Sequence, residues 1–453
     1  MSEGTIMRDL TQGNPMKQLL KFAFPFILAN LLQQAYNLVD LMIVGRFVGS
    51  AGLAAVASGG EITMLFLFGA MGFASGGQVV IAQHLGAGSR DKLGRTIGTM
   101  FSFVFLMGVG FMILALTTCT WVLQVMNVPP ESVNYAYDYC MVYFIGMLPV
   151  CGYNVVSSIL RGMGDSKHPF IFIAIAAVLN VILDLIFVGP LQMACMGAAL
   201  ATVISQTLSF LVALVFLYRH KEEFGFDFRP KSFRIDKREL GAMFHIGLPL
   251  GVMNIAVSVT MLVIAGYVNA YGVVAAAASG VGNKITMVAT ICTGAMMTAG
   301  NSAIAQNFAA GKYQRVRQIL GCILVICLGF CGLLALILAL FPEQVFGIFD
   351  SNPDVLALSH SYVLPGCLGL IGFATRGAGF AFCNGIGNAK LSFYGGLFDG
   401  LVFRIGLGLL FGITLKMEVQ GFWLGNAIAG NIIGLVVLPY YLSGKWKSHK
   451  LLV

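Results

Sequence analysis

The sequence predicts an all-α polytopic membrane protein with twelve transmembrane helices. Of its 453 residues, 58% are hydrophobic and only 10% are charged, and the mean hydropathy is +0.86. A soluble domain carries about 25% charged residues. Twelve stretches approach or exceed the roughly 20 apolar residues that a helix needs to cross the hydrocarbon. Runs such as CILVICLGFCGLLALILAL (322–340) do not alternate, which argues against a transmembrane barrel.

The expected spans divide evenly between the two halves of the chain. In the first half they cover residues 17–44, 52–84, 95–124, 135–160, 169–188 and 194–218, and in the second half residues 240–269, 274–308, 316–349, 357–382, 391–414 and 420–443. Several exceed 25 residues, which indicates tilt or helix that continues beyond the bilayer. Pro25 and Pro249 lie early in the first span of each half, where proline favours a bend.

The two halves repeat each other in sequence. IAQHLGAG (81–88) matches IAQNFAAG (304–311), and RGMGDSK (161–167) matches NGIGNAK (384–390), each 223 residues later. Six spans per half predict parallel repeats, and transporters built from repeats often hold substrate between them near mid-membrane. We therefore expect two six-helix lobes, an N-terminal one over 1–218 and a C-terminal one over 240–453, joined by a cytoplasmic linker over 219–239.

The basic residues lie mostly on one side of the predicted topology. The loops on the other side hold only Arg46 and Lys416. By the positive-inside rule, both termini are cytoplasmic. The net charge of +8 therefore reflects topology and does not indicate nucleic-acid binding. His84 lies near the cytoplasmic face, where a solvated side chain is expected.

Four acids lie within the predicted spans, and Asp40 is the first. Gln33, Tyr36, Asn37 and Asp40 follow one another at helical spacings of three and four, which places them on one face. Ionisable groups inside a membrane are expensive and are functional candidates by default, with a structural ion pair as the alternative. A polar face on an apolar helix faces protein or water rather than lipid, so we expect these four residues to line a substrate cavity.

A second polar group lies in LNVILDLIF (179–187). Asn180 and Asp184 are one helical turn apart, and Thr202 lies in the next span. A carboxylate, an amide oxygen and a hydroxyl suit Na⁺ coordination or a proton relay. No cluster of histidines or thiolates suggests a transition metal, and no cofactor is expected beyond Na⁺ or H⁺ as the coupling ion.

The remaining charged candidates include an equivalent pair in the two repeats. Glu61 in GGEITM corresponds to Lys284 in GNKITM, and the repeat symmetry predicts that they approach each other across a central cleft. Asp399 and Arg404 are five residues apart, about 140° around an α-helix, so we expect each to have a partner elsewhere. These four residues are further cavity candidates, and Arg376 is the third base within a span.

The motifs that would indicate an enzyme or an ATP-driven pump are missing. The chain has no Walker A sequence, no H-E-x-x-H and no G-x-S-x-G. Catalysis and ATP dependence are therefore not expected. The repeated lobes favour a carrier over a channel.

In combination, several short motifs resemble one known family. YNLVD (36–40), ILRGMGD (159–165) and NVILD (180–184), in this order and spacing, are similar to the multidrug and toxic compound extrusion (MATE) family, prokaryotic branch, over essentially the whole chain. The resemblance implies a V-shaped pair of six-helix lobes with alternating access. It assigns coupling and drug release to Asp40, a cation site to Asn180, Asp184 and Thr202, and cavity positions to Tyr36 and Asn154.

The expected function is secondary active efflux of small organic cations in exchange for Na⁺ or H⁺. The protein is expected to act as a monomer in the inner (plasma) membrane, in contact with lipids. A flippase for lipid-linked cell-envelope precursors is the alternative. Such anionic lipids favour several bases in the cavity, whereas four acids and three bases lie within these spans.

Overall fold

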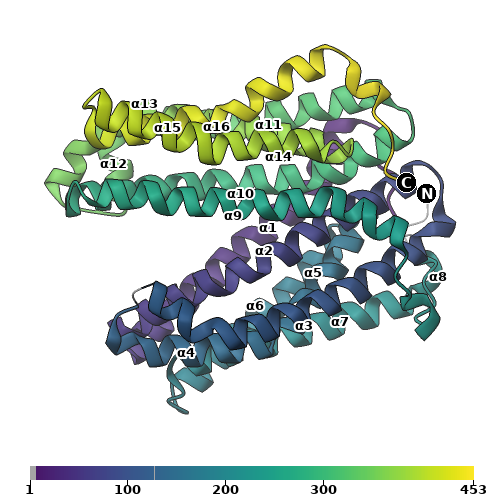
Figure 1. Ribbon diagram of the computed structural model, residues 1–453, viewed down its shortest axis with the longest axis horizontal. Helices are drawn as coiled ribbons and strands as arrows, with labels where there is room; N and C mark the ends of the chain where they lie inside the picture. Colours follow the sequence, from purple (N-terminus) through teal and green to yellow (C-terminus); the bar gives the residue numbers. More distant parts are fainter. Residues whose placement is uncertain (1–6, 127) are drawn as a thin grey trace. The chain divides into compact units, whose positions relative to one another are not determined.

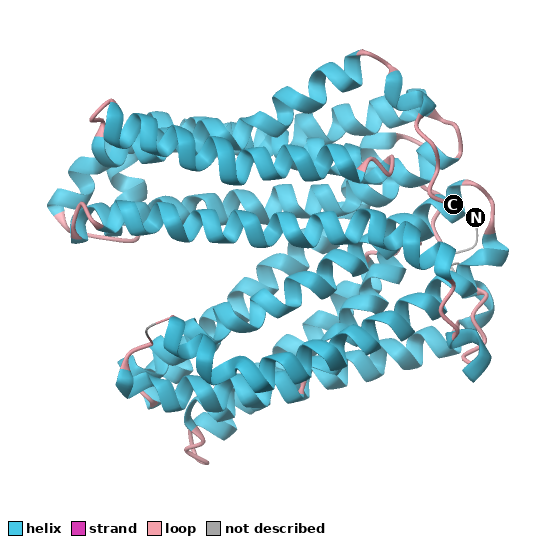
Figure 2. Ribbon diagram, viewed as in Figure 1, coloured by secondary structure: helices cyan, strands magenta, loops and turns pink. Residues whose placement is uncertain are grey.

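The computed structural model describes residues 7–126 and 128–453. Figure 2 shows helices joined by short loops, and the described residues contain no strand. Eleven helices are long and apolar enough to cross a membrane, and a bent pair, Pro130–Ile145 with Met147–Gly162, makes a twelfth span when it is counted as one. The predicted all-helical fold with twelve spans is therefore confirmed.

The chain contacts divide the protein into two units. Unit 1 contains Phe24–Gly251, and unit 2 contains Leu10–Ala23 and Val252–Leu452. Both boundaries fall inside helices, α1 (Pro15–Phe47) and α9 (Lys237–Asn269), next to Pro25 and Pro249. The 219–239 segment, expected to link the lobes, lies wholly within unit 1. Each half of the sequence thus begins with a helix that belongs to both units.

Unit 1 is a bundle in which α2, α4, α5 and α7 pack against one another and α6 packs on α7 (Figure 1). Its elements after α1 are α2 (Ser50–Gly86), η1 (Arg90–Lys92), α3 (Leu93–Val125), α4 (Pro130–Ile145), α5 (Met147–Gly162), α6 (Lys167–Val188), α7 (Ala194–Arg219), α8 (Lys221–Phe224) and η2 (Pro230–Phe233).

The fourth span is broken, a feature that the sequence analysis did not predict. Its two helices, α4 and α5, meet at Gly146 at an angle of 54°. Pro149 lacks the N–H that would bond to the Ile145 carbonyl, and its ring would clash there. A Cβ on Gly146 would come within 2.2 Å of the Val203 side chain on α7. Proline therefore ends the helix, and glycine lets α7 approach the break.

Unit 2 is built around α13, which packs against α10, α11 and α16 (Figure 1). Its elements after α9 are α10 (Val273–Ala309), α11 (Tyr313–Leu340), α12 (Pro342–Gly347), α13 (Pro353–Gly385), α14 (Ala389–Leu397), η3 (Phe398–Arg404), α15 (Ile405–Leu409), η4 (Leu410–Thr414), α16 (Glu418–Leu442) and η5 (Lys445–Ser448). Residues Ala389–Thr414 form one candidate span, in which η3 and η4 are π-helical.

The sequence repeat is also a repeat of backbone geometry. Gly164 and Gly387 are 223 residues apart, and their φ angles are 85° and 84°. In each copy the side chain of the next residue accepts a backbone N–H from the first turn of the following helix: the Asp165 carboxylate accepts the Lys167 N–H at 3.0 Å, and the Asn388 amide oxygen accepts the Leu391 N–H at 3.2 Å. The matching RGMGDSK and NGIGNAK motifs are therefore turns that start α6 and α14.

Candidate functional site

Two carboxylates lie together in the interior of unit 1. Asp40 on α1 is 8% exposed, and Asp184 on α6 is fully buried. The two groups are close enough to interact directly. One Asp40 oxygen and both Asp184 oxygens nevertheless lack a hydrogen-bond partner of normal geometry among the described residues. No basic side chain is among the groups that act on either carboxylate. Neither carboxyl group therefore has a basic partner within the described part of the chain.

Asn180 and Thr202 extend this group of oxygen atoms. Asn180 is buried one turn before Asp184, and its Nδ2 donates to the Thr202 hydroxyl at 3.4 Å. The Thr202 hydroxyl donates in turn to the Ala198 carbonyl at 3.1 Å. The Asn180 side-chain oxygen has no partner in the described part of the chain. Carboxylate, amide and hydroxyl oxygens are hard ligands that suit a small cation or a proton.

Tyrosine and glutamine side chains adjoin the acid pair. The buried Tyr36 hydroxyl interacts with Gln33 on its own helix and with Gln206 on α7. Tyr139 on α4 is buried next to Asp40. Neither Gln206 nor Tyr139 was predicted from the sequence as a site residue. Tyr139 belongs to a run of tyrosines four residues apart (135, 139, 143), and this spacing, which places them on one helix face, could have identified it as a site residue.

The other predicted cavity residues form no hydrogen bond with this cluster within the described part of the chain. Asn37 is exposed, unlike Tyr36 and Asp40 on the same helix. The Asn154 side chain donates to the Val150 carbonyl of its own helix at 2.9 Å. Glu61 on α2 and Lys284 on α10 are both exposed and belong to different units. Their approach to each other stays a prediction.

Asp399 and Arg404 pair with each other, so the expectation that their spacing prevents a pair within the helix was wrong. Each also has a partner elsewhere, as expected: Arg376 for Asp399 and Asn426 for Arg404. Arg404 Nη2 donates to Asp399 Oδ1 at 2.8 Å, and both side chains are buried. The physical reason is the π-helical geometry of η3, which brings residues five apart onto one face. Asp399 also forms a longer ion pair with Arg376 on α13, at 3.6 Å.

His84 is not solvated, which corrects a second expectation. It is fully buried at the end of α2, and its Nε2 lies 3.0 Å from Oε2 of Glu239 in the first turn of α9. The Thr96 hydroxyl on α3 donates to the same oxygen at 2.9 Å. Asp236 caps α9 by accepting the Arg238 N–H at 2.8 Å, which orients this turn. The cluster joins the start of α9 to α2 and α3.

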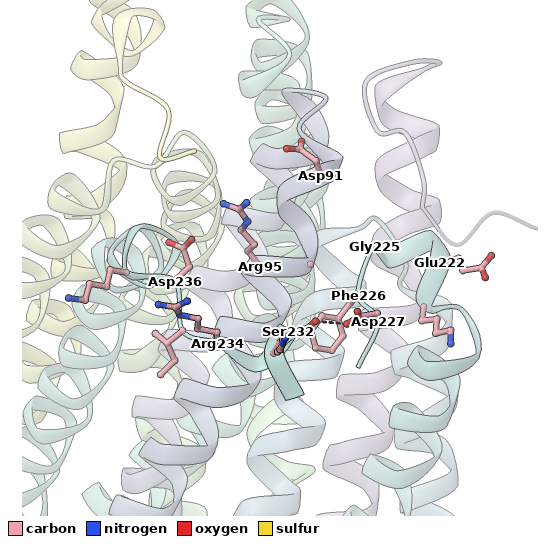
Figure 3. A pocket seen from close by; sticks show the side chains of 14 residues that line it. Asp91, Arg95, Glu222, Gly225, Phe226, Asp227, Ser232, Arg234 and Asp236 are labelled. Carbon is pink, nitrogen blue, oxygen red and sulfur yellow. Dashed lines mark hydrogen bonds between the residues drawn. The ribbon is translucent and has the colours of Figure 1, made fainter. Parts of the chain in front are cut away.

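A large hollow of about 860 Å³ lies between the 221–237 segment and the start of α3 (Figure 3). Its charged lining residues are Asp91, Arg95, Lys221, Glu222, Asp227, Lys231, Arg234, Asp236 and Lys237. The Ser232 hydroxyl and the Arg229 backbone N–H hold the pKa of Asp227 below its usual range. Because four acids and five bases line the hollow, neither sign of charge clearly predominates there.

The repeated helical units, the candidate spans and the buried acids are together those of a polytopic membrane transporter. The MatE family model matches residues 25–186 and matches again over residues 249–410. The chain therefore belongs to the MatE family, and each half of it carries one copy of the family's repeat.

Relatives and solved structures agree with this assignment over the whole chain. The probable multidrug resistance protein YpnP of Bacillus subtilis (strain 168) is 30% identical over 98% of this chain and 98% of its own length. YoeA of the same organism, also described as a probable multidrug resistance protein, is 27% identical over 99% and 98%. A structure described as the outward-facing conformation of a multidrug resistance MATE family transporter has a TM-score of 0.90 at 22% identity, and all of both chains is covered.

Proposed function

We propose that this protein is a secondary active antiporter that exports organic, amphipathic, cationic compounds in exchange for Na⁺ or H⁺ by alternating access. Membership of the MatE family supports transport, and the names of the Bacillus subtilis relatives support multidrug efflux. In this proposal the protein acts as a monomer in the plasma membrane and needs neither ATP nor a bound cofactor.

The observation that carries the proposal is the Asp40–Asp184 pair without a base. Two carboxylates in a medium of low dielectric repel each other strongly when both are ionised. Uptake of one H⁺ or one Na⁺ removes much of that repulsion. The unpartnered oxygens of Asp40, Asp184 and Asn180 are the atoms that would hold the ion.

Coupling follows from competition for this negative charge. When the pair is vacant and ionised, it attracts a cationic drug. When it holds the coupling ion, it attracts the drug less. Linkage requires the effect to be reciprocal, so the drug must also weaken ion binding. Tyr36 and Tyr139 next to the pair supply aromatic surface for an organic cation.

Reconstituted transport tests this proposal. In proteoliposomes with an imposed Na⁺ or pH gradient, the wild-type protein should move a fluorescent cationic dye against its gradient. Asp40→Asn and Asp184→Asn should each abolish uphill movement, and the double variant should lose no more, because the two carboxylates act as one unit. Glu131→Gln, which removes an exposed acid of the same unit, is the matched control and should retain transport.

Full gradient-driven transport by folded Asp40→Asn protein would contradict the assignment of ion coupling to the Asp40–Asp184 pair. Translocation of a lipid-linked precursor together with indifference to the dye would favour a flippase instead.

A further inference from the structure

A cavity of about 210 Å³ lies inside unit 2, among α9, α10, α13, η3 and α16. Arg376 and Arg404 are its charged lining residues, and Asp399 is not part of the lining. Apolar and aromatic side chains make up much of the remaining wall, including Met261, Phe422 and Trp423. The cavity therefore combines two guanidinium groups with an apolar surface.

The charges around this cavity do not balance. Both guanidiniums remain protonated in proteins, and Asp399 is the acid that the structure pairs with them. Two positive charges against one negative charge leave an excess of one positive charge. A buried charge is costly unless it is paired, so the site favours a ligand that brings a negative charge.

The two arginines differ in how fully they are engaged. Arg404 donates to Asp399 at 2.8 Å, to the Asn426 amide oxygen at 2.7 Å and to the Met261 sulfur at 3.4 Å. Arg376 has only the 3.6 Å ion pair with Asp399 and a contact with the Phe380 ring, 5.5 Å from its centroid. Its side chain is 17% exposed, and it makes no hydrogen bond with any described residue. Its donors are therefore available to a ligand.

The apolar part of the cavity wall indicates that the ligand has an apolar body besides its anionic end. The Trp423 indole is fixed by its Nε1–H, which donates to the Ser279 hydroxyl at 2.8 Å, and by an edge contact with Tyr362. A rigid aromatic side chain next to a guanidinium fits a molecule with an apolar body and an anionic end. A guanidinium binds carboxylate and phosphate oxygens in the same forked geometry.

We propose that the unit 2 cavity binds an organic oxyanion, a carboxylate or phosphate on a small apolar body, with Arg376 as its principal donor and Arg404 held in place by Asp399 and Asn426. This site is distinct from the acid pair of unit 1 and does not depend on the proposed antiport. It adds an anion-recognising site to a protein whose other intramembrane candidates favour cations.

Calorimetric titration of the purified full-length protein in detergent at pH 7, without any gradient, tests the proposal. The probes are 3-phenylpropionate, its neutral amide of the same shape, and 3-phenylpropylamine as the cation. The wild-type protein should bind the carboxylate more tightly than the amide or the amine. Arg376→Gln should weaken carboxylate binding by about 10- to 100-fold, the range for a hydrogen bond between charged groups, and leave amide binding unchanged.

Two further variants separate charge loss from misfolding. Arg376→Lys keeps the positive charge but loses the forked guanidinium geometry, so its affinity for the carboxylate should lie between those of the wild type and Arg376→Gln. Lys447→Gln removes an exposed charge of unit 2 outside the cavity and should bind like the wild type. Equal binding of carboxylate and amide, tightest binding of the amine, or wild-type carboxylate affinity in Arg376→Gln would each overturn the proposal.

Nanodiscs distinguish the two sources of an oxyanion. If phosphatidylglycerol weakens 3-phenylpropionate binding relative to phosphatidylcholine alone, the natural occupant is a lipid phosphate. If it does not, the occupant is a soluble oxyanion. Both results support the oxyanion site, provided that the Arg376 variants behave as expected.

Discussion

The last-but-one span of each half carries buried charge, but the two units use it in opposite ways. In unit 1, α6 presents Asp184, whose oxygens have no hydrogen-bond partner among the described residues. In unit 2, the equivalent span presents Asp399 and Arg404, which bond to each other at 2.8 Å. With the 223-residue offset, Asp184 corresponds to Leu407 and Asp399 corresponds to Ala176. The two halves share a fold but not a charge pattern.

The difference separates buried ionisable groups that are free to bind an ion from buried groups that are paired within the protein. A charge with a close partner contributes to the folded structure, and removing one member is costly. A buried ionisable group without a partner raises the free energy of the folded state, which makes it a candidate for a functional role. By this criterion the acids of unit 1 are the ion-coupling candidates, and Asp399 mainly orders the arginines of unit 2.

The comparison predicts its largest effect at Asp399. Asp399→Asn leaves Arg376 and Arg404 buried without a counter-charge, and we expect it to lower the free energy of unfolding by about 3–5 kcal/mol. Thermal unfolding of the purified protein in detergent measures the change. Replacing Asp399 and Arg404 together with apolar residues of similar volume should recover much of the loss. Wild-type stability of Asp399→Asn would remove the contrast between the two units.

A smaller effect of a different kind is expected at Asp184. Asp184→Asn breaks no hydrogen bond of normal geometry and relieves repulsion from Asp40, so the free energy of unfolding should change by less than about 1 kcal/mol or rise. Added Na⁺, or protons if the coupling ion is H⁺, should stabilise the wild type by mass action and the variant much less. Melting curves over a series of Na⁺ concentrations and pH values give both quantities.

Glu131→Gln is the control for this experiment, since it removes an exposed acid and should keep the wild-type ion response. A drop in the stability of Asp184→Asn as large as that of Asp399→Asn would mean that Asp184 has a structural partner after all.

Much of the fold could be predicted from the sequence, because membrane spans and repeats are local signals. Long apolar runs gave the twelve spans, and matched motifs gave the duplication that the family match confirms. The break of the fourth span also has a local signal, Pro149 three residues after Gly146. Hydropathy does not show this break, because the residues on both sides of it are apolar. Proline position, rather than apolar length, was the informative feature there.

The parts that could not be predicted depend on distance in the chain and on helix type. His84 and Glu239 are 155 residues apart, and nothing near either residue indicates the other. The Asp399–Arg404 pair follows a π-helical register, whereas the predicted angle assumed an α-helix. The wider turn of the π-helix places Arg404 on the same face as Asp399, five residues earlier.

The smallest effects are expected at Glu61 and Lys284, the equivalent charged residues on α2 and α10. Both side chains are exposed, so Glu61→Gln and Lys284→Gln should each change the free energy of unfolding by less than about 0.5 kcal/mol. Stability measurements of these two variants beside Asp184→Asn and Asp399→Asn, under the same conditions, show whether the difference between the two repeats is confined to buried charges. If Lys284→Gln were far more destabilising than Glu61→Gln, the difference between the repeats would extend to their exposed faces, and burial alone would not explain it.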